Sequence, residues 1–497
     1  MSSVARTIPN PRFRSRAARA LYERAWTLTL SAAMVCWMVV LFAASRDAYT
    51  GFRLGRFDLG NMVQAVWSTT QGRPLESTDN ATGEQMVRLG GHADPFLVLL
   101  APVWKAWPSP LSLALVQIAV VSLGALPVFW LARRRLENER VAGLLALAYL
   151  AYPWVATSAY SAIHPVTFAI PFLLFCVWFL ETDRLVPFAV FALLTMSTGE
   201  LMGVPIMALG IWYAFAHGRR LAGAATTACG LAWTLFAVYV VVPHFAGADS
   251  QFFGFYDQIG GSPQGVVRML FSHPGTVLGA LVESQDIAYL LWLAVPLLGL
   301  FFLSPGLAAV ALPQLLANGL SDFRSMTDPR YHSVAAVIPF LIAATVLGVA
   351  KIRPSRRGLA AAAVLVCSLI ITLVVGPWVR VIGGTPLGGR PRVASARVDA
   401  LAAAVAAVPD GVPVSSSNTV GAHLSDRRYV YSVPDLGRAT WVVIDLGDPF
   451  VVTPDSPILT QHPKLARALA ARLGRDPRWT KVSAREGVLV FRRRSRD

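Results

Sequence analysis

Four ionisable side chains stand beside long apolar segments, where a charge is costly unless it has a partner or a function. Asp58 comes first, in the run GRFDLGNMVQAVWSTTQGRP at residues 55–74, shortly after an apolar segment. Its carboxylate can cap a helix by accepting a backbone N–H, or it can act as a base. The two roles are compatible because a capping carboxylate stays ionised. Asp58 is therefore the first candidate for a catalytic base.

Three further candidates share this kind of position. His92 and Asp94 lie in the run GGHADP at residues 90–95, and Glu200 lies between two apolar segments. The proline after Asp94 is typical of a helix start, which explains Asp94 by capping but leaves His92 unexplained. An ionised glutamate costs roughly 2.5–3.5 kcal/mol or more at the centre of a bilayer. The predicted catalytic residues are Asp58, His92, Asp94 and Glu200.

A second group of side chains suits a phosphate. His164 precedes a proline at the start of an apolar segment, and the run DFRSMTDPRYH at residues 322–332 precedes another. Arginine stays charged and binds phosphate through two parallel hydrogen bonds. An ordinary charged loop is the alternative interpretation of this run. The predicted lipid-phosphate ligands are His164, Arg324, Arg330, Tyr331 and His332.

The sequence contains no motif for metal or nucleotide chemistry. HExxH, a Walker loop, a nucleophile elbow and a helix-opening GxGxxG turn are all absent. The four cysteines lie inside apolar segments without CxxC spacing, which indicates core residues and not a metal site. We expect no cofactor, although a divalent metal stays open, and an ATP-driven pump is not supported.

The composition sets the class of protein that must position these residues. Of 497 residues, 55% are hydrophobic and 14% are charged, against roughly 25% charged in soluble domains. Apolar stretches near the ~20 residues that span a bilayer recur along the chain. This predicts a polytopic α-helical membrane protein of about eleven spans, the least certain being those at 185–216. The predicted spans are 26–44, 111–132, 141–157, 166–181, 185–198, 201–216, 221–243, 287–303, 305–320, 333–350 and 359–382.

Lysine and arginine predict the orientation. They are dense in residues 1–25 and in the short loops after the second, sixth and tenth segments, which places these parts in the cytoplasm. The apolar run of the first segment is longer than the 7–15 residues usual in a signal peptide, so we expect it to remain as a span. The net charge of +16 then suits anionic lipid headgroups or cell-wall polymers, and not nucleic acid.

The chain divides into two bodies after the basic N-terminus. Residues 26–382 form the membrane domain, whose first outer loop, 46–110, is long and contains two helices expected at the membrane interface, near 59–70 and 96–107. Residues 383–497 have the composition of a small α/β domain, with short strands, an amphipathic helix at 464–473 and a final hairpin. An odd number of spans places this C-terminal domain outside the cell membrane.

Four runs together carry a family resemblance. They are FDLGNMVQAVWSTTQGRP at 57–74, GGHADPFLVLLAP at 90–102, SAIHPVTFAIPFLL at 161–174 and YHSVAAVIPFL at 331–341. The chain resembles, over nearly its whole length, the prokaryotic predicted membrane proteins of domain of unknown function 2079, a family name that states no activity.

The layout also resembles the GT-C superfamily of membrane glycosyltransferases. Those proteins have many spans, a long first outer loop, an acidic residue just after the first span and often a soluble extracytoplasmic domain. They take sugars from polyprenyl-phosphate carriers on the outer face. On this resemblance, Asp58 matches the catalytic acidic residue. The paired carboxylates that such chains show in a later outer loop have no clear counterpart here, and Asp94 or Glu200 would substitute for them.

The resemblance implies an inverting glycosyltransferase of the plasma membrane that moves a sugar from a polyprenyl-phosphate donor to a cell-envelope glycan or lipid. Asp58 would deprotonate the acceptor, Arg324, Arg330 or His332 would stabilise the leaving phosphate, and His92 and Glu200 would orient the substrates. The alternatives are a transporter or flippase of lipid-linked intermediates, favoured only by the break near Glu200, or a non-catalytic membrane protein.

Overall fold

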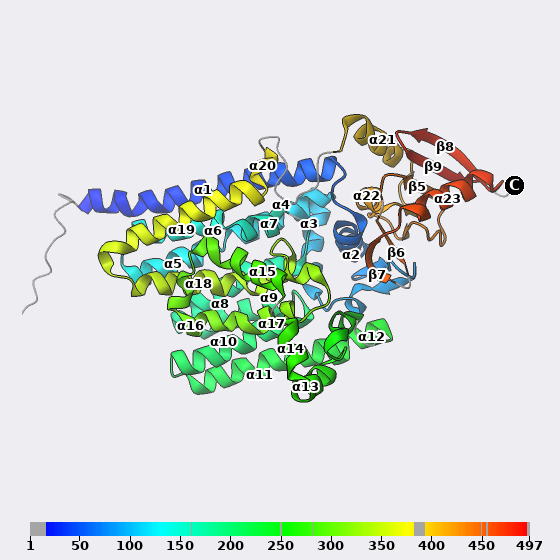
Figure 1. Cartoon of the computed structure of the whole chain (residues 1–497). Helices are drawn as coiled ribbons and strands as arrows, with labels where there is room; N and C mark the ends of the chain where they lie inside the picture. Colours follow the sequence, from blue (N-terminus) through cyan, green and yellow to red (C-terminus); the bar gives the residue numbers. More distant parts are fainter. Residues whose placement is uncertain are drawn as a thin grey trace, which may run out of the picture.

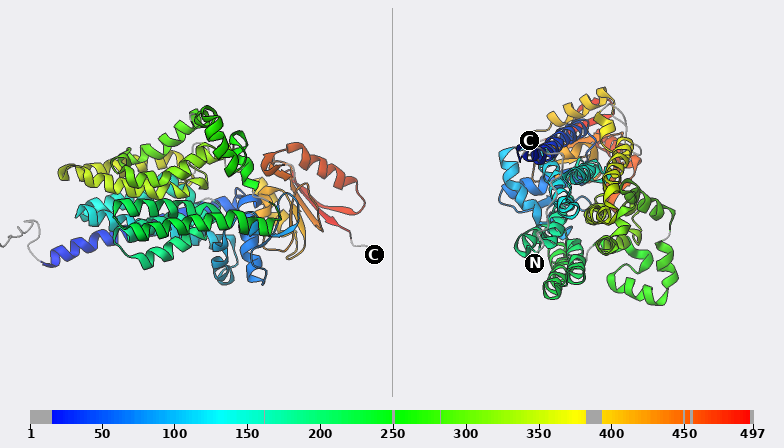
Figure 2. Two further views of the ribbon diagram at one scale, coloured as in Figure 1. Left: turned by 90° about the horizontal axis from the view of Figure 1, so that it is seen from below. Right: turned by 90° about the vertical axis from the view of Figure 1, so that its left-hand side faces the viewer.

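The computed structural model describes residues 16–160, 162–248, 251–281, 283–381, 393–448, 450–453 and 456–494. A long helical body and a smaller body built on a β-sheet lie end to end (Figures 1 and 2). The predicted domain boundary at 382/383 falls in residues 382–392, outside the described residues.

The helical body follows from apolar segments separated by prolines and capping residues. Several helices have proline in their first turn, and Ser109 and Asn138 cap helices by accepting hydrogen bonds from the backbone N–H groups of Leu111 and Val141. The helices up to residue 216 are α1 (Arg16–Thr50), α4 (Pro110–Ser122), α5 (Ala125–Leu136), α6 (Glu139–Ala151), α7 (Pro153–Tyr160), α8 (Ala169–Glu181), α9 (Leu185–Met196) and α10 (Gly203–Ala216). Those beyond it are α11 (Arg220–Phe236), α12 (Val242–Ala246), α13 (Pro263–Ser272), α14 (Pro274–Ala280), α15 (Ser284–Ala294), α16 (Pro305–Ala308), α17 (Leu312–Gly319), α18 (Ile338–Lys351), α19 (Pro354–Val375) and α20 (Trp378–Val381).

The predicted count of eleven spans is not confirmed. Within the described residues, four stretches are long and apolar enough to cross a membrane, 25–50, 110–136, 220–246 and 354–375, and two bent helix pairs raise this number to six. The shorter apolar helices have 10–17 residues. At 1.5 Å per residue they reach about 15–26 Å, less than the ~30 Å hydrocarbon core. The predicted spans at 185–198 and 201–216 correspond to two separate short helices, α9 and α10, which residues 197–202 connect.

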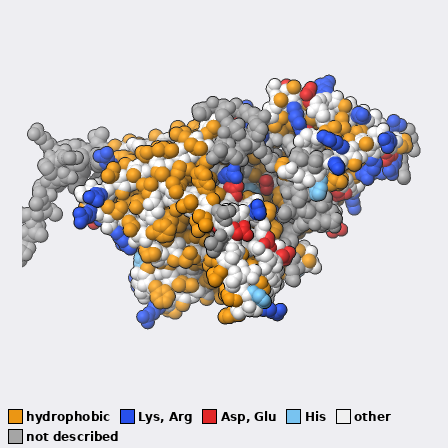
Figure 3. Space-filling model, in the orientation of Figure 1, with side chains coloured by type: hydrophobic (Ala, Val, Ile, Leu, Met, Phe, Trp, Pro, Cys, Tyr) orange, Lys and Arg blue, Asp and Glu red, His pale blue; other side chains and the backbone are white. Residues whose placement is uncertain are grey.

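Hydrophobic side chains cover much of the visible face of the helical body (Figure 3). Lysine and arginine gather on the C-terminal body and at the end of the helical body that is distant from it. Large apolar side chains on several helices are strongly exposed, among them Phe215 at 86% and Leu221 at 86%. Apolar surface on this scale is unfavourable in water and suits a bilayer.

The first loop folds as a unit. It contains a π-helix, η1 (Arg56–Gly60), then α2 (Asn61–Thr70), the hairpin β1–β2 (Glu76–Thr78 and Gln85–Val87), and three short helices, η2 (Arg88–Gly90), η3 (Pro95–Leu100) and α3 (Ala101–Ala106). Apolar residues of α2, η3 and α3 pack into one core with Phe168 and Phe172. The two helices predicted in this loop are therefore present, and the hairpin between them was not predicted.

The C-terminal body has a five-stranded sheet covered by two helices, together with a separate two-stranded sheet, β6–β7, and the short helices α22 and η13. The strands of the larger sheet lie in the order β4-β3-β5-β9-β8; β3 is parallel to β4 and β5, and the remaining pairs are antiparallel. Helices α21 and α23 cover opposite faces, because Val443 packs with α21 while its neighbours Val442 and Ile444 pack with α23. The elements are α21 (Ser395–Ala406), β3 (Val414–Ser416), α22 (Asn418–Gly421), η13 (Ala422–Leu424), β4 (Val430–Ser432), β5 (Trp441–Asp445), β6 (Phe450–Thr453), β7 (Ser456–Gln461), α23 (Pro463–Arg475), β8 (Trp479–Arg485) and β9 (Val488–Arg493).

The two bodies meet at the first loop, through the same run that contains Asp58. The buried guanidinium of Arg56 donates hydrogen bonds to Ser432 Oγ at 2.7 Å, to the Thr78 carbonyl at 3.0 Å and to the Val430 carbonyl. The Phe57 amide donates to Asn418 Oδ1 at 2.9 Å. These hydrogen bonds hold the C-terminal domain against η1. Because they are buried in the interface, water cannot take the place of either partner.

Rings complete this contact at the end of α1. The imidazole of His423 stacks on Tyr49 and on Phe52, with ring centroids 4.1 Å apart in each pair. Its Nε2 lies 3.1 Å from the Tyr49 carbonyl. Burial lowers the pKa of His423 to about 4, so the imidazole is neutral near pH 7 and joins the interface as an aromatic ring.

Candidate active site

Asp58 lies in η1 with its carboxylate half-buried. It does not occupy the N-cap position, which is Gly55 for η1 and Gly60 for α2, so the predicted capping role is wrong. The reason is that the helical backbone begins earlier than the apolar pattern indicates, at Arg56. Asp58 instead stands in the first turn, where the helix dipole favours a negative charge.

The histidines expected from two distant runs come together next to Asp58. The rings of His164 and His332 stack with centroids 4.1 Å apart, and Tyr331 packs against His332 at 4.0 Å. Burial, and then the negative charge of Asp58, raise the pKa of Tyr331 above its ordinary value. Tyr331, His332 and His164 therefore form one group of packed rings, and the charge of Asp58 acts on its Tyr331 end.

Both stacked histidines are neutral near pH 7. Burial is the main cause; it lowers the pKa of His164 to about 3, helped by the positive charges of Arg88 and His92. Burial likewise lowers the pKa of His332, and His164, His92 and Arg88 lower it further. The pair therefore offers ring N–H donors without a net charge.

This arrangement predicts a pH dependence of stability. Because the pKa of His164 falls from 6.5 to about 3 on folding, the unfolded chain binds more protons than the folded chain between these values. Stability rises with pH through this window and is lost as the pH falls below about 6.5. We expect the Tm of the purified protein to drop between about pH 7.5 and pH 5, and to drop less in His164→Phe. The exposed His273 supplies the control, since His273→Phe should keep the wild-type dependence; identical pH dependence in all three proteins would contradict the assignment.

His92 and Glu200 connect the first loop to the break between α9 and α10. His92 Nδ1 lies 3.2 Å from Glu200 Oε1, and the Ala93 amide donates to Glu200 Oε2 at 3.1 Å. The Phe96 amide donates to the Ser197 carbonyl at 3.0 Å, which joins the same two segments again. The two predicted residues therefore meet, and Glu200 has a structural role in holding the loop.

Removing the Glu200 carboxylate should cost stability. Hydrogen bonds to charged groups contribute about 1.5–3 kcal/mol each, but the His92 side chain is 39% exposed, which weakens one of the two. We expect Glu200→Ala to lose about 2 kcal/mol in denaturant unfolding. Glu283 is exposed, so Glu283→Ala should lose much less, and equal losses in the two variants would refute this role of Glu200.

Asp94 occupies the N-cap position of η3, before Pro95, as its run predicts. Its carboxylate makes no capping hydrogen bond and instead accepts from Arg88, with Nε–Oδ2 at 2.9 Å and Nη2–Oδ2 at 2.8 Å. Burial raises the pKa of Asp94, while Arg88 opposes that shift. A carboxylate engaged by arginine in this way is poorly suited to act as a base, and it fixes the guanidinium beside the histidines.

Arg88 is the residue of this cluster that the sequence analysis did not single out. Its positive charge acts on both stacked histidines, and its side chain is 11% exposed. The available signal was its position two residues before the GGHADP run, six residues from a carboxylate that could neutralise it.

The two predicted arginine ligands are exposed residues of the loop before α18. Arg330 is exposed and pairs with Asp328 in its own loop, with Nη2–Oδ2 at 2.6 Å. Arg324 is exposed in a short 3-10 helix, Arg324–Thr327. Their predicted phosphate role stays a prediction, and Arg88 is an arginine whose positive charge acts on both stacked histidines.

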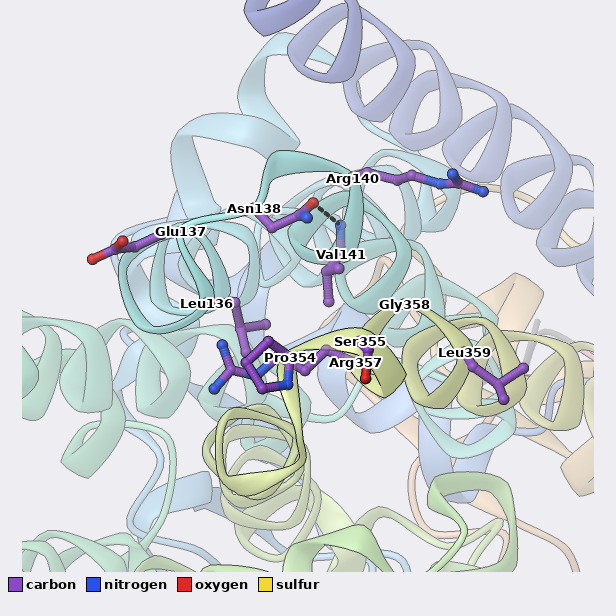
Figure 4. A pocket seen from close by; sticks show the side chains of 10 residues that line it. All are labelled: Leu136, Glu137, Asn138, Arg140, Val141, Pro354, Ser355, Arg357, Gly358 and Leu359. Atoms are coloured by element: carbon purple, nitrogen blue, oxygen red, sulfur yellow. Dashed lines mark hydrogen bonds between the residues drawn. The ribbon is translucent and has the colours of Figure 1, made fainter. Parts of the chain in front are cut away.

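A cavity of about 460 Å³ lies between the α5–α6 turn and the start of α19. It is at the end of the helical body that lies away from the first loop and the C-terminal body (Figures 1 and 4). Three charged residues line it; Glu137 and Arg140 extend to opposite sides, Arg357 is the third, and Asn138 caps the Val141 amide (Figure 4). None of the predicted site residues lines it. Across the described parts of the chain, no group of three or more His, Cys, Asp or Glu side chains is arranged to hold a metal ion.

Solved structures share this architecture. ArnT from Cupriavidus metallidurans matches in its apo state with a TM-score of 0.56, at 12% identity, over 94% of this chain and 98% of that one. The same enzyme bound to undecaprenyl phosphate matches with a TM-score of 0.55, at the same identity and coverage. The apo oligosaccharyltransferase of Archaeoglobus fulgidus has a TM-score of 0.49, at 12% identity, over 83% of this chain and 69% of that one. These neighbours are GT-C glycosyltransferases, and at such identity the likeness to ArnT shows a common fold.

No curated protein matches the chain. The model of the family described as "Predicted membrane protein (DUF2079)" matches residues 48–490. This range contains Asp58, the histidine cluster and the C-terminal sheet up to the first residues of β9. The chain belongs to the DUF2079 family of predicted membrane proteins.

Proposed function

We propose that this protein is an inverting glycosyltransferase that takes a sugar from a polyprenyl-phosphate donor at the outer face of the plasma membrane. The observation that carries the proposal is the group formed by Asp58, Tyr331, His332 and His164, with Arg88 beside it. It unites three runs that are far apart in sequence, at the junction of the first loop with the helical body. The GT-C fold of the neighbours and the undecaprenyl phosphate bound to ArnT support a lipid-linked donor.

In this proposal Asp58 is the base. It takes the proton of an acceptor hydroxyl, whose oxygen then forms a bond to the anomeric carbon of the donor sugar. The bond from that carbon to the phosphate oxygen breaks, and polyprenyl phosphate leaves with the electron pair. Because the leaving group is already an ionised phosphate, no general acid is required.

The remaining side chains would stabilise charge on the departing phosphate. Tyr331, His164 and His332 are neutral donors near pH 7, and Arg88 supplies a fixed positive charge behind them. Donors held in place in a partly buried site stabilise developing negative charge without reorganisation. For the donor to arrive from the outer leaflet, the N-terminus is cytoplasmic and the C-terminal domain extracytoplasmic.

The test is transfer of radiolabelled sugar. Membranes containing the protein are incubated with polyprenyl-phosphate sugars, and label in the glycan and lipid fractions is compared with that of membranes lacking it. We expect label in the glycan or lipid fraction only when the protein is present. We expect the transferred sugar to have the inverted configuration at its anomeric carbon. Movement of the intact donor across vesicle membranes, without transfer, would contradict the proposal and indicate a flippase.

A further inference from the structure

A second cavity, of about 370 Å³, lies between the first loop and the C-terminal domain. Its volume is at the lower end of the roughly 300–1,000 Å³ of small-molecule sites. None of the catalytic candidates lines it. Its lining residues are Thr82, Gly83, Glu84, Gln85, Tyr429, Tyr431, Asp435, Gly437 and Arg438.

The walls of this cavity are fixed by contacts between the two bodies. A Cβ added at Gly83, where φ is +72°, would come within 2.1 Å of Asp435 Oδ2 and 3.1 Å of the Tyr431 ring. Only glycine allows so close an approach of the hairpin turn. Asp79 Oδ1 accepts hydrogen bonds from the amide and the hydroxyl of Thr82, at 2.7 and 3.0 Å, and so fixes the turn. The cavity is therefore pre-formed.

Hydrogen bonds fix the side of the cavity that Gln85 forms. Gln85 Nε2 donates to the Thr78 hydroxyl at 2.7 Å. The same hydroxyl accepts from Gln64 Nε2 at 3.1 Å and from the Val430 amide at 3.2 Å. Gln85 thus joins the hairpin to α2 and to β4, so this wall of the cavity is in place before any ligand binds.

The remaining lining side chains indicate the chemistry of a ligand that would fit this cavity. The guanidinium of Arg438 lies over the ring of Tyr429, 5.5 Å from its centroid, and supplies donors. The carboxylates of Glu84 and Asp435 supply acceptors. Mixed donors and acceptors of opposite charge suit a neutral ligand with many hydroxyl groups, since each hydroxyl both donates and accepts. A phosphate would meet the two carboxylates, and an apolar ligand would leave all these groups unpaired.

We propose that this cavity binds a short glycan and serves as the acceptor subsite; the acceptor role rests on the proposed function. Sugar hydroxyls donate to the carboxylates of Glu84 and Asp435, and accept from Arg438. Because the cavity joins the hairpin of the first loop to the C-terminal domain, a glycan bound there lies against the same loop that carries Asp58.

Sugar binding is tested without catalysis, by saturation-transfer NMR on the full-length protein in detergent micelles. The probes are α-1,6-mannobiose, cellobiose and chitobiose at millimolar concentration. We expect at least one to receive saturation from wild type, and to lose most of it with Arg438→Ala or Glu84→Ala, both exposed positions whose loss leaves the fold intact. Arg485→Ala, an exposed arginine at the end of β8 on the opposite edge of the sheet, is the matched control. Absence of saturation for all three sugars, or equal saturation in Arg438→Ala, would overturn the proposal.

A second comparison separates this site from the proposed function. Asp58→Asn should bind the sugar as wild type does, because Asp58 does not line the cavity. Sugar binding without any transfer would support the site and contradict the glycosyltransferase. Transfer whose acceptor KM is unchanged in Arg438→Ala would support the glycosyltransferase and overturn the site.

Discussion

Replacing Asp58 by Asn will lower the rate of sugar transfer by about 10²–10⁴-fold, the usual contribution of a general base. Asparagine keeps the shape of the side chain but cannot accept the proton of the acceptor hydroxyl. The KM for the donor should change little, because the donor phosphate would contact the histidines and Arg88. The measurement is kcat and KM for transfer from the polyprenyl-phosphate donor, with thermal unfolding to show that the variant is folded.

Asp47 offers the matched control. It lies in the last turn of α1, near the same loop, and pairs with Arg53 through an Nη2–Oδ2 contact of 2.5 Å, with its side chain 41% exposed. Asp47→Asn removes a carboxylate that pairs with Arg53, so kcat should stay near the wild-type value. If Asp58→Asn retained full activity, Asp58 would not be the base, and Glu200 would be the next carboxylate to test.

Much of the helical body is predictable because its segments are apolar throughout, and an apolar stretch bounded by proline or capping residues forms a helix whatever its neighbours. The span count is not confirmed, because several of the apolar helices are short. An apolar segment that is hydrophobic enough can still be short when it packs in the interior, as α8 does: most of its residues are buried. Hydropathy gives the apolar character of such a helix but not whether it reaches both faces of a membrane.

The site was predictable as a set of separate charges and not as a cluster. The runs around Asp58, His92, His164 and His332 each place a polar residue at the end of an apolar segment, and that pattern is visible in the sequence. Which of them meet depends on how the segments pack. The hairpin β1–β2 was missed because its strands have three residues each, too few for an alternating pattern to stand out.

The limit of prediction from the sequence is clearest at Arg56. It reads as an ordinary loop arginine, yet its side chain is 1% exposed, and the Ser432 hydroxyl that it contacts lies 376 residues further along the chain. Burial lowers its pKa to about 10, while Asp79 and Asp435 act in the opposite direction. It is therefore still charged near neutral pH, and nothing local in the sequence reveals the partners that a buried charge requires.

That burial makes Arg56 the residue whose loss should most weaken the assembly. Arg56→Met keeps the length and the apolar stem but leaves the Ser432 hydroxyl and the carbonyls of Thr78 and Val430 without their donor. Each buried group left unpaired costs roughly 1–3 kcal/mol, so for three groups we expect a loss of about 3–9 kcal/mol and a clear fall in Tm. Arg56→Lys should recover only part of it, because an ammonium cannot reproduce the planar fork.

Hydrogen exchange tells undocking of the C-terminal domain from general destabilisation. The Val430 amide donates to Thr78 Oγ1 across the interface, at 3.2 Å, so its exchange should accelerate in Arg56→Met while amides inside β5 and β9 stay protected. Arg428 crosses the same interface to Glu76 at 3.3 Å but is 49% exposed, and an exposed ion pair contributes at most about 1 kcal/mol. Arg428→Met should therefore leave both Tm and Val430 protection near wild type. A similar response of the two variants would mean that Arg56 does not hold the domain. If Arg56→Met undocks the domain as expected, it should also abolish sugar binding in the interdomain cavity, since one wall of that cavity leaves with the domain.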